Sequence, residues 1–200
     1  MNHLLVVIGV TALLFQSMTA QAQEAGLPLQ GRVSILANPS YFVLGGYHIS
    51  PMYHFPQRWS VGLTAQGGFQ LPEFVRDDFF QHQIEDLAID WAYAIGVEVN
   101  YRFSRASFDK GFYVNGSVGY EGWRATEAAN SDEFRNWFTS ISLGYNWFPF
   151  RRDRLHLGLR YSLIFLLNNT EPRDLGNGTY QLRRIVPPSI APSVFIGWRL

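Results

Sequence analysis

The residues that could do chemistry in this chain are charged side chains set among apolar and small neighbours. They are Glu98, Arg102, Glu121, His156, Arg160 and Arg199. Carboxylate and guanidinium groups that leave water must find partners of opposite charge, so Glu98 or Glu121 could pair with Arg102 or Arg160. We interpret the set as a polar network that fills the interior of the fold. A gated ion path is the alternative.

Metal and thiol chemistry find no support in the sequence. The five histidines are dispersed, His82 stands alone among acidic residues, and no pair has the spacing of a metal site. The chain has no cysteine, which excludes disulfides and a thiol nucleophile. We therefore predict no catalytic residue, no metal and no cofactor.

The elements that position these residues are strands, because apolar and polar side chains alternate with period two over long stretches. In residues 137–147 every second side chain is large or β-branched, and those between are mostly small or polar. Residues 91–103, 112–121 and 155–165 repeat the pattern. A helical period would scatter the same residues around a cylinder.

The strands follow one another with short turns and long connections in alternation. The predicted strands are 32–38, 47–55, 59–69, 91–103, 112–121, 137–148, 155–165 and 190–200, and the long connections are 39–46, 71–88, 124–135 and 168–188. Strands in this order close a sheet when the first pairs with the last. The sequence therefore predicts an all-β fold, an eight-stranded antiparallel up-and-down barrel.

The composition indicates what covers this barrel. Charged residues make up only 16% of the chain, aromatic residues another 16%, and the formal net charge is zero. Water-soluble domains carry about a quarter charged residues. Part of the surface is therefore expected to face something other than water, and the charge balance disfavours a nucleic-acid partner.

The tryptophans lie at strand ends, where the aromatic girdles of membrane barrels lie. Trp59, Trp147 and Trp198 are beside short turns, and Trp91, Trp123 and Trp137 are beside long loops. Trp123 falls out of register with the alternation, so we expect a bulge there. The pattern predicts apolar side chains facing lipid, polar side chains facing inward, and an aromatic girdle formed by Trp59, Trp91, Trp137, Trp147 and Trp198.

The N-terminus has the features of a secretory signal. Residues 4–15 form an apolar run too short to span a bilayer as a helix, and the small-x-small sequence Ala20-Gln21-Ala22 follows. We predict a signal peptide over residues 1–22 and a barrel domain over residues 23–200, located in the bacterial outer membrane.

Over residues 30–200 the chain resembles small outer-membrane barrels of the OmpA and OmpX kind. The last strand of such barrels carries alternating apolar residues up to a terminal aromatic, which the barrel-assembly machinery reads. Here Val194, Ile196, Trp198 and Leu200 supply the alternation, but the terminal residue is Leu rather than Phe. The resemblance implies a transmembrane barrel, with outer-membrane lipid, lipopolysaccharide and the assembly machinery as partners.

We predict a structural, adhesive or surface-interaction role through the extracellular loops, because functional residues concentrate on loops over a rigid scaffold. A porin-like architecture of only eight strands leaves no open aqueous channel, so a general porin is not expected.

Two alternatives remain open. His48 and Ser50 resemble the His-x-Ser pair of barrel-type lipid A deacylases, which faces lipid, whereas alternation here places both residues inward. A soluble lipocalin-like carrier would also alternate, with its apolar face inside.

Overall fold

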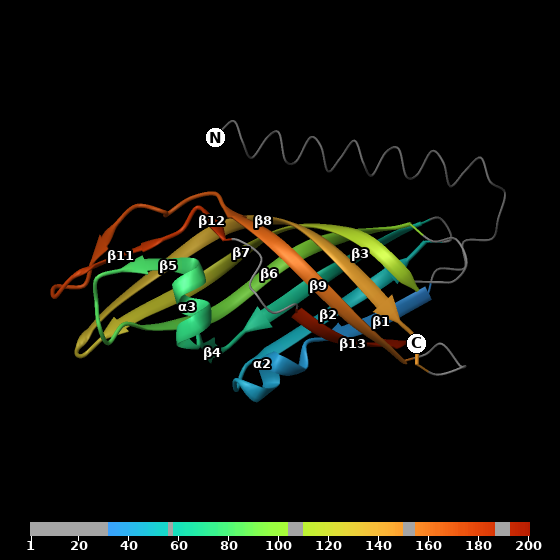
Figure 1. Cartoon of the computed structure of the whole chain (residues 1–200), viewed down its shortest axis with the longest axis horizontal. Coiled ribbons are helices and arrows are strands. Elements are labelled where there is room, and N and C mark those ends of the chain that lie inside the picture. Colours follow the sequence, from blue (N-terminus) through green and yellow to red (C-terminus); the bar gives the residue numbers. More distant parts are fainter. Residues whose placement is uncertain (1–31, 56–57, 104–109, 150–154, 187–192) are drawn as a thin grey trace.

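The computed structural model describes residues 32–55, 58–103, 110–149, 155–186 and 193–200. Eight strands pair side by side in one antiparallel sheet that closes into a barrel (Figure 1). At one end of the barrel the connections between strands fold into short helices and strands of their own. The predicted signal peptide, residues 1–22, lies outside the described residues.

The barrel closes between its first and last strands. Its strands are β1 (Arg32–Ala37), β2 (Tyr47–His54), β3 (Trp59–Gly67), β6 (Ala88–Arg102), β7 (Gly111–Glu127), β8 (Asn130–Trp147), β9 (Leu155–Leu166) and β13 (Ser193–Arg199). β13 pairs with both β1 and β9, and Ala37 of β1 lies opposite Ile196. The predicted eight-stranded antiparallel up-and-down β-barrel is confirmed.

The two faces of the barrel wall differ as the alternation predicts. On the outer face Leu63, Ile141 and Leu143 are 61%, 59% and 54% exposed. On the inner face Asn115 and Ser142 are buried. Apolar side chains in such numbers are unfavourable in water and favourable in hydrocarbon. This distribution is the reverse of the apolar cavity that a lipocalin-like carrier requires.

A β-bulge changes the alternation near the loop end of β6. Trp91 lies opposite Trp123 of β7 and Tyr93 lies opposite Gly122, so Ala92 is left without a partner on β7. One extra residue reverses the alternation, so side chains before and after it follow opposite parities. The prediction that Trp91 belongs to the outward girdle is therefore wrong. Trp91 is only 7% exposed and stacks inside against Trp123, with ring centroids 5.2 Å apart.

The predicted loop over residues 124–135 is also wrong, because β7 and β8 continue through it as a paired hairpin. The pairing runs to Glu127 opposite Asn130. Along this extension Ala125 and Phe134 are buried, so one face of the hairpin is held by apolar contacts.

The remaining loop-end connections also contain regular structure. They form α2 (Pro39–Val43), β4 (Phe69–Gln70), α3 (Glu73–Phe79), β5 (Phe80–His82), β10 (Arg173–Asp174), β11 (Thr179–Leu182) and β12 (Ile185–Val186). β10, β11 and β5 form a separate three-stranded sheet, and β12 pairs with β9. We call residues 71–87, 122–135 and 168–186 the loop cap.

The hydrophobic core of the described chain lies at the loop end. Its buried members include Phe69, Phe80, Ile84, Leu87, Trp91, Trp123, Phe134, Tyr180 and Leu182. These residues come from both the barrel strands and the loop cap, so their burial fixes the cap to the barrel. Among the described residues, no helix is long and apolar enough to cross a membrane.

Candidate functional site

The carboxylate of Glu98 is buried inside the barrel, where this residue is 2% exposed. Arg160 forms an ion pair with it, Nη1 to Oε2 at 2.9 Å. Asn115 donates an amide hydrogen bond to the same oxygen at 3.0 Å, and the Ser50 hydroxyl donates to Oε1. A buried charge held by an opposite charge and by further donors is adequately compensated. Glu98 therefore acts as an acceptor for three different strands.

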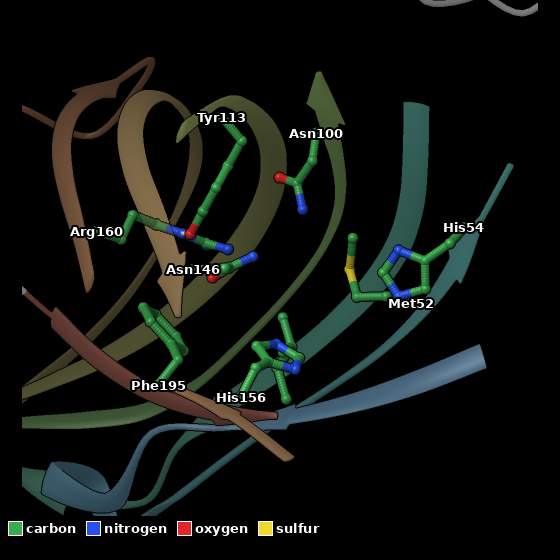
Figure 2. Close-up of a pocket in the computed structure, with 9 residues that line it drawn as sticks. Met52, His54, Asn100, Tyr113, Asn146, His156, Arg160 and Phe195 are labelled. Carbon is green, nitrogen blue, oxygen red and sulfur yellow. Dashed lines mark hydrogen bonds between the residues drawn. The ribbon is translucent and has the colours of Figure 1, made fainter. Parts of the chain in front are cut away.

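The guanidinium of Arg160 has a second set of contacts. Its Nε donates to the Tyr113 hydroxyl at 3.3 Å, and its Cζ lies 4.6 Å from the centre of the Phe195 ring. Figure 2 shows Arg160 beside Tyr113 and Asn146, with Phe195 on the neighbouring strand. Hydrogen bonds and a cation–π contact fix the position of the guanidinium.

The other predicted interior residues form separate groups. Arg102 is buried and donates to the backbone carbonyls of Arg58, at 3.3 Å, and Phe55, at 3.1 Å. His156 and Arg199 are buried and both lie against Phe148: the His156 ring centroid is 5.0 Å and the Arg199 Cζ 5.2 Å from the centre of its ring.

Glu121 is 3% exposed, and its Oε1 has no hydrogen-bond partner among the described residues. Of the ion pairs that the sequence allowed, the structure contains Glu98 with Arg160.

Several interior residues were not singled out from the sequence. Asn100 and Asn115 lie opposite each other on β6 and β7, and the Asn115 amide donates to Asn100 Oδ1 at 2.7 Å. Ser142 donates to Ser162 at 2.8 Å. Their signal was present, since each occupies an inward position of the alternation. The sequence alone did not show which inward residues meet.

His48 and Ser50 both point into the barrel, as their positions in the alternation predicted. His48 is 4% exposed, and its ring lies edge-on to Tyr41 and Phe195 at 5.6 and 5.2 Å. Ser50 is fully buried and donates to Glu98. Neither side chain is on the lipid-facing side.

Little space remains between these side chains. The cavity drawn in Figure 2, beside Met52, His54 and His156, has a volume of about 10 Å³. A cavity needs roughly 10 to 15 Å³ to hold one water molecule. The part of the lumen around this cavity is therefore filled by side chains.

The outward tryptophans lie where an aromatic girdle would. Trp137, Trp147 and Trp198 are 42%, 51% and 49% exposed on the outer face. Trp59 is half-buried against Tyr101, with ring centroids 4.8 Å apart. With Trp91 inside the fold, these four remain available for the predicted girdle.

A second candidate site lies on the loop cap, as a groove with a volume of about 420 Å³. We call it the cap groove. It is lined by Gln81, Thr170, Glu171, Gln181, Leu182, Arg183, Arg184 and Ile185. Gln81 and Gln181 are directly paired between β5 and β11, and the Gln181 amide donates to the Thr170 carbonyl at 2.8 Å.

The cap groove has an excess of positive charge. Arg183 and Arg184 contribute two guanidinium groups and Glu171 one carboxylate, and no ion pair within the described residues joins them. Arg183 Nε is buried and has no hydrogen-bond partner among the described residues. A buried donor without an acceptor is unfavourable, so this groove is suited to a ligand with acceptor oxygens. Sequence reasoning missed it, because adjacent arginines do not reveal that Gln81 lies beside them.

The cap is held together by an ionic contact around Asp132. The Asp132 carboxylate accepts hydrogen bonds from Tyr180 at 2.7 Å and from Arg173 at 2.8 Å. Burial raises the pKa of Asp132, but the Tyr180 and Arg173 hydrogen bonds together lower that pKa below its ordinary value. The carboxylate is therefore ionised at neutral pH and links the β7–β8 hairpin to β10 and β11.

Among the described residues, no group of three or more His, Asp or Glu side chains is placed to hold a metal ion.

Comparisons with known proteins give a fold resemblance. No protein-family model matches the chain, and no curated protein matches it. Among solved structures, that of Ail, the attachment invasion locus protein of Yersinia pestis, is similar with a TM-score of 0.40 and 11% identity. The alignment covers 87% of this chain and 100% of that one. A structure of Ail in complex with the heparin analogue sucrose octasulfate matches with a TM-score of 0.41 and 11% identity. At this level of similarity neither structure assigns a family or a ligand to the chain.

Proposed function

We propose that this protein is a bacterial outer-membrane barrel that holds a folded loop cap at the cell surface, where the cap binds a ligand bearing an oxyanion. The proposal is supported by the cap groove, in which two guanidinium groups lie without an acidic partner among the described residues. Guanidinium groups bind carboxylate and phosphate oxygens through paired hydrogen bonds. The role is one of adhesion or surface interaction rather than general diffusion.

The membrane placement is supported by the outer face of the barrel. Leu63, Ile95 and Ile141 are each more than half exposed there, and such a belt requires a lipid environment. Short turns of outer-membrane barrels face the periplasm and longer loops face outward. The loop cap is therefore on the exterior, level with or above the lipopolysaccharide leaflet.

The C-terminal strand supports assembly by the barrel-assembly machinery. Val194, Ile196 and Trp198 alternate on the outer face of β13 and are 39%, 40% and 49% exposed. This row is the feature that the machinery is proposed to read. Replacing Trp198 with Ser should reduce the amount of protein recovered in the outer membrane.

Gel migration tests the barrel and its location together. The protein extracted from outer-membrane fractions should migrate faster before boiling than after it, because a closed barrel stays compact until heat opens it. Equal migration in both samples, or recovery of the protein in the soluble periplasmic fraction, would argue against the membrane proposal.

Titration of the protein with oxyanions, followed through the NMR signals of its arginine side chains, tests the ligand site. We expect inorganic phosphate or glucuronate to produce saturable shifts of the Arg183 and Arg184 Nε–Hε NMR signals in detergent micelles, and Arg183→Gln should abolish the shift of the Arg184 signal. Arg135, exposed on β8 outside the groove, provides the control signal. Equal, non-saturating shifts at the groove arginines and at Arg135 would indicate a general charge effect and contradict a specific site.

We also propose that the protein is not a hydrolase of lipid acyl chains. His48 and Ser50 are enclosed in the barrel, and Ser50 is hydrogen-bonded to Glu98. A lipid substrate outside the wall does not reach them. Outer membranes containing the wild type or Ser50→Ala should show the same lipid A acylation, and a loss of deacylation in the variant would overturn this proposal.

A further inference from the structure

The connection between β1 and β2 differs from the other loop-end connections in having no charge. Residues 33–57 contain no Lys, Arg, Asp or Glu, whereas 71–88, 124–135 and 168–188 each contain several. Loops in water normally carry charged residues that keep them solvated. This connection is therefore composed for a different environment.

The short helix α2 within this connection exposes three consecutive apolar side chains. Phe42, Val43 and Leu44 are 56%, 86% and 40% exposed. The helix carries no acidic residue in its first turn and no basic residue in its last. Three adjacent apolar side chains facing water would be unfavourable.

The backbone of α2 is held in a defined turn. The Asn38 side chain accepts a hydrogen bond from the Ser40 N–H at 3.0 Å, which caps the start of the helix. At the other end the Gly46 N–H donates to the Tyr41 carbonyl at 2.8 Å, and Gly45 has a φ of 87°, which favours glycine. The exposure of the apolar side chains is thus a fixed feature of the turn.

Tyr41 orients the helix relative to the barrel. Its ring faces the interior and lies 4.9 Å from Phe69 and 5.8 Å from Trp91. With Tyr41 anchored inside, the adjacent Phe42 and Val43 are turned outward. Figure 1 shows α2 beside the end of β2 and apart from β5 and β11 of the loop cap.

The apolar surface of α2 continues that of the barrel wall. α2 contacts β2 and β13, and the first outward residues of β2, Tyr47 and Ile49, are 40% and 48% exposed. On β13, Val194 is 39% exposed on the same outer surface. The side chains of α2 therefore extend the lipid-facing belt at its upper rim.

We infer that α2 is a lipid anchor: Phe42, Val43 and Leu44 insert into the outer leaflet and contact acyl chains just below the headgroups. The inference rests on the proposed membrane placement of the barrel. It assigns a partner, membrane lipid, to a connection that would otherwise be counted among the surface loops. Aromatic and aliphatic side chains at this depth fix a membrane protein vertically in the bilayer.

The absence of cysteine from the chain makes a direct test possible. Val43→Cys introduces a single thiol, which can carry the fluorophore NBD in the full chain reconstituted into phosphatidylcholine vesicles. Acyl chains brominated at different depths then report lipid contact by quenching. Leu63→Cys, within the barrel belt, is the lipid-exposed control, and Phe74→Cys on α3, 74% exposed in the acidic loop, is the water-exposed control.

We expect NBD at position 43 to emit at shorter wavelength than NBD at position 74, and bromine near the headgroups to quench it most strongly. An unquenched signal at position 43, with position 63 quenched, would overturn the inference. Short-wavelength emission at position 43 without quenching would also overturn the inference, because a second protein copy rather than lipid would then cover α2. If position 63 is also unquenched, the membrane placement itself fails.

Discussion

Glu98 Oε2 and Arg160 Nη1 are 2.9 Å apart inside the barrel, although β6 and β9 are separated by β7 and β8 in the wall. The two side chains are 2% and 11% exposed. They cross the lumen to meet, and Asn115 of β7 joins them. The ion pair thus connects strands that share no backbone hydrogen bonds.

Removing the Glu98 charge should destabilise the barrel strongly. In Glu98→Gln the Arg160 guanidinium is left buried without its counter-charge, and breaking one side of a buried pair costs about 3 to 5 kcal/mol. Urea unfolding in phospholipid vesicles measures the change in free energy of unfolding. Adding Arg160→Met should recover part of the loss, because no unpaired charge then remains.

An exposed ion pair provides the matched control for that prediction. Glu133 and Arg124 are 2.7 Å apart, with side chains 65% and 52% exposed. Exposed pairs contribute about 0 to 1 kcal/mol, so Glu133→Gln should have little effect. Equal losses in Glu98→Gln and Glu133→Gln would contradict the importance assigned to the interior pair.

Gly197 should be intolerant of a side chain, whereas Gly116 should accept one. A Cβ at position 197 would overlap the imidazole of His156 and lie 2.6 Å from Leu36 Cδ2. Overpacking of this kind costs about 1 to 3 kcal/mol. Gly116 has no atom within 4 Å of the corresponding position. Gly197→Ala and Gly116→Ala should therefore differ in free energy of unfolding, and similar values would show that the lumen is less tightly filled.

Trp91 should contribute more to the stability of the loop cap than Trp137. Trp91 is buried against Trp123, whereas Trp137 is 42% exposed on the outer face. Replacing a buried tryptophan with alanine costs about 3 to 5 kcal/mol. Limited chymotrypsin digestion should cleave the cap of Trp91→Ala faster than that of Trp137→Ala. The reverse order would mean that Trp91 lies in the outward girdle after all.

Acidification should open the loop cap through Asp132. Its pKa in the folded protein is lowered below 3.8, so its contribution to stability is complete above that value and is lost as the pH falls through the lowered pKa. Pepsin digestion at decreasing pH should show cleavage of the cap below pH 3.8. Asp132→Asn should show cleavage that depends less on pH. A wild-type cap as resistant to pepsin below pH 3.8 as it is at acidic pH above that value would exclude this role.

The sequence alone determined the barrel. Period two is a property of adjacent residues, so the alternation in 137–147 or 155–165 revealed both the strand and its outward face. The number of strands followed from the alternation of short turns and long connections. The inward position of Glu98 and Arg160 followed from the same period, because the apolar residues next to them in the chain occupy the opposite, outward face.

Only the tertiary structure decided the cap, the partners and the position of Trp91. Gln81 and Gln181 meet although they are far apart in the chain, and nothing local marks such a contact. Ala92, which has no partner on β7, turns Trp91 inward. The alternation indicated a bulge at Trp123, but only the register of β6 with β7 places the extra residue on β6. Glu98 pairs with Arg160 rather than with Arg102, because closure of the barrel wall determines which side chains face one another across the lumen. Local alternation specifies a face, whereas register and closure specify the contacts.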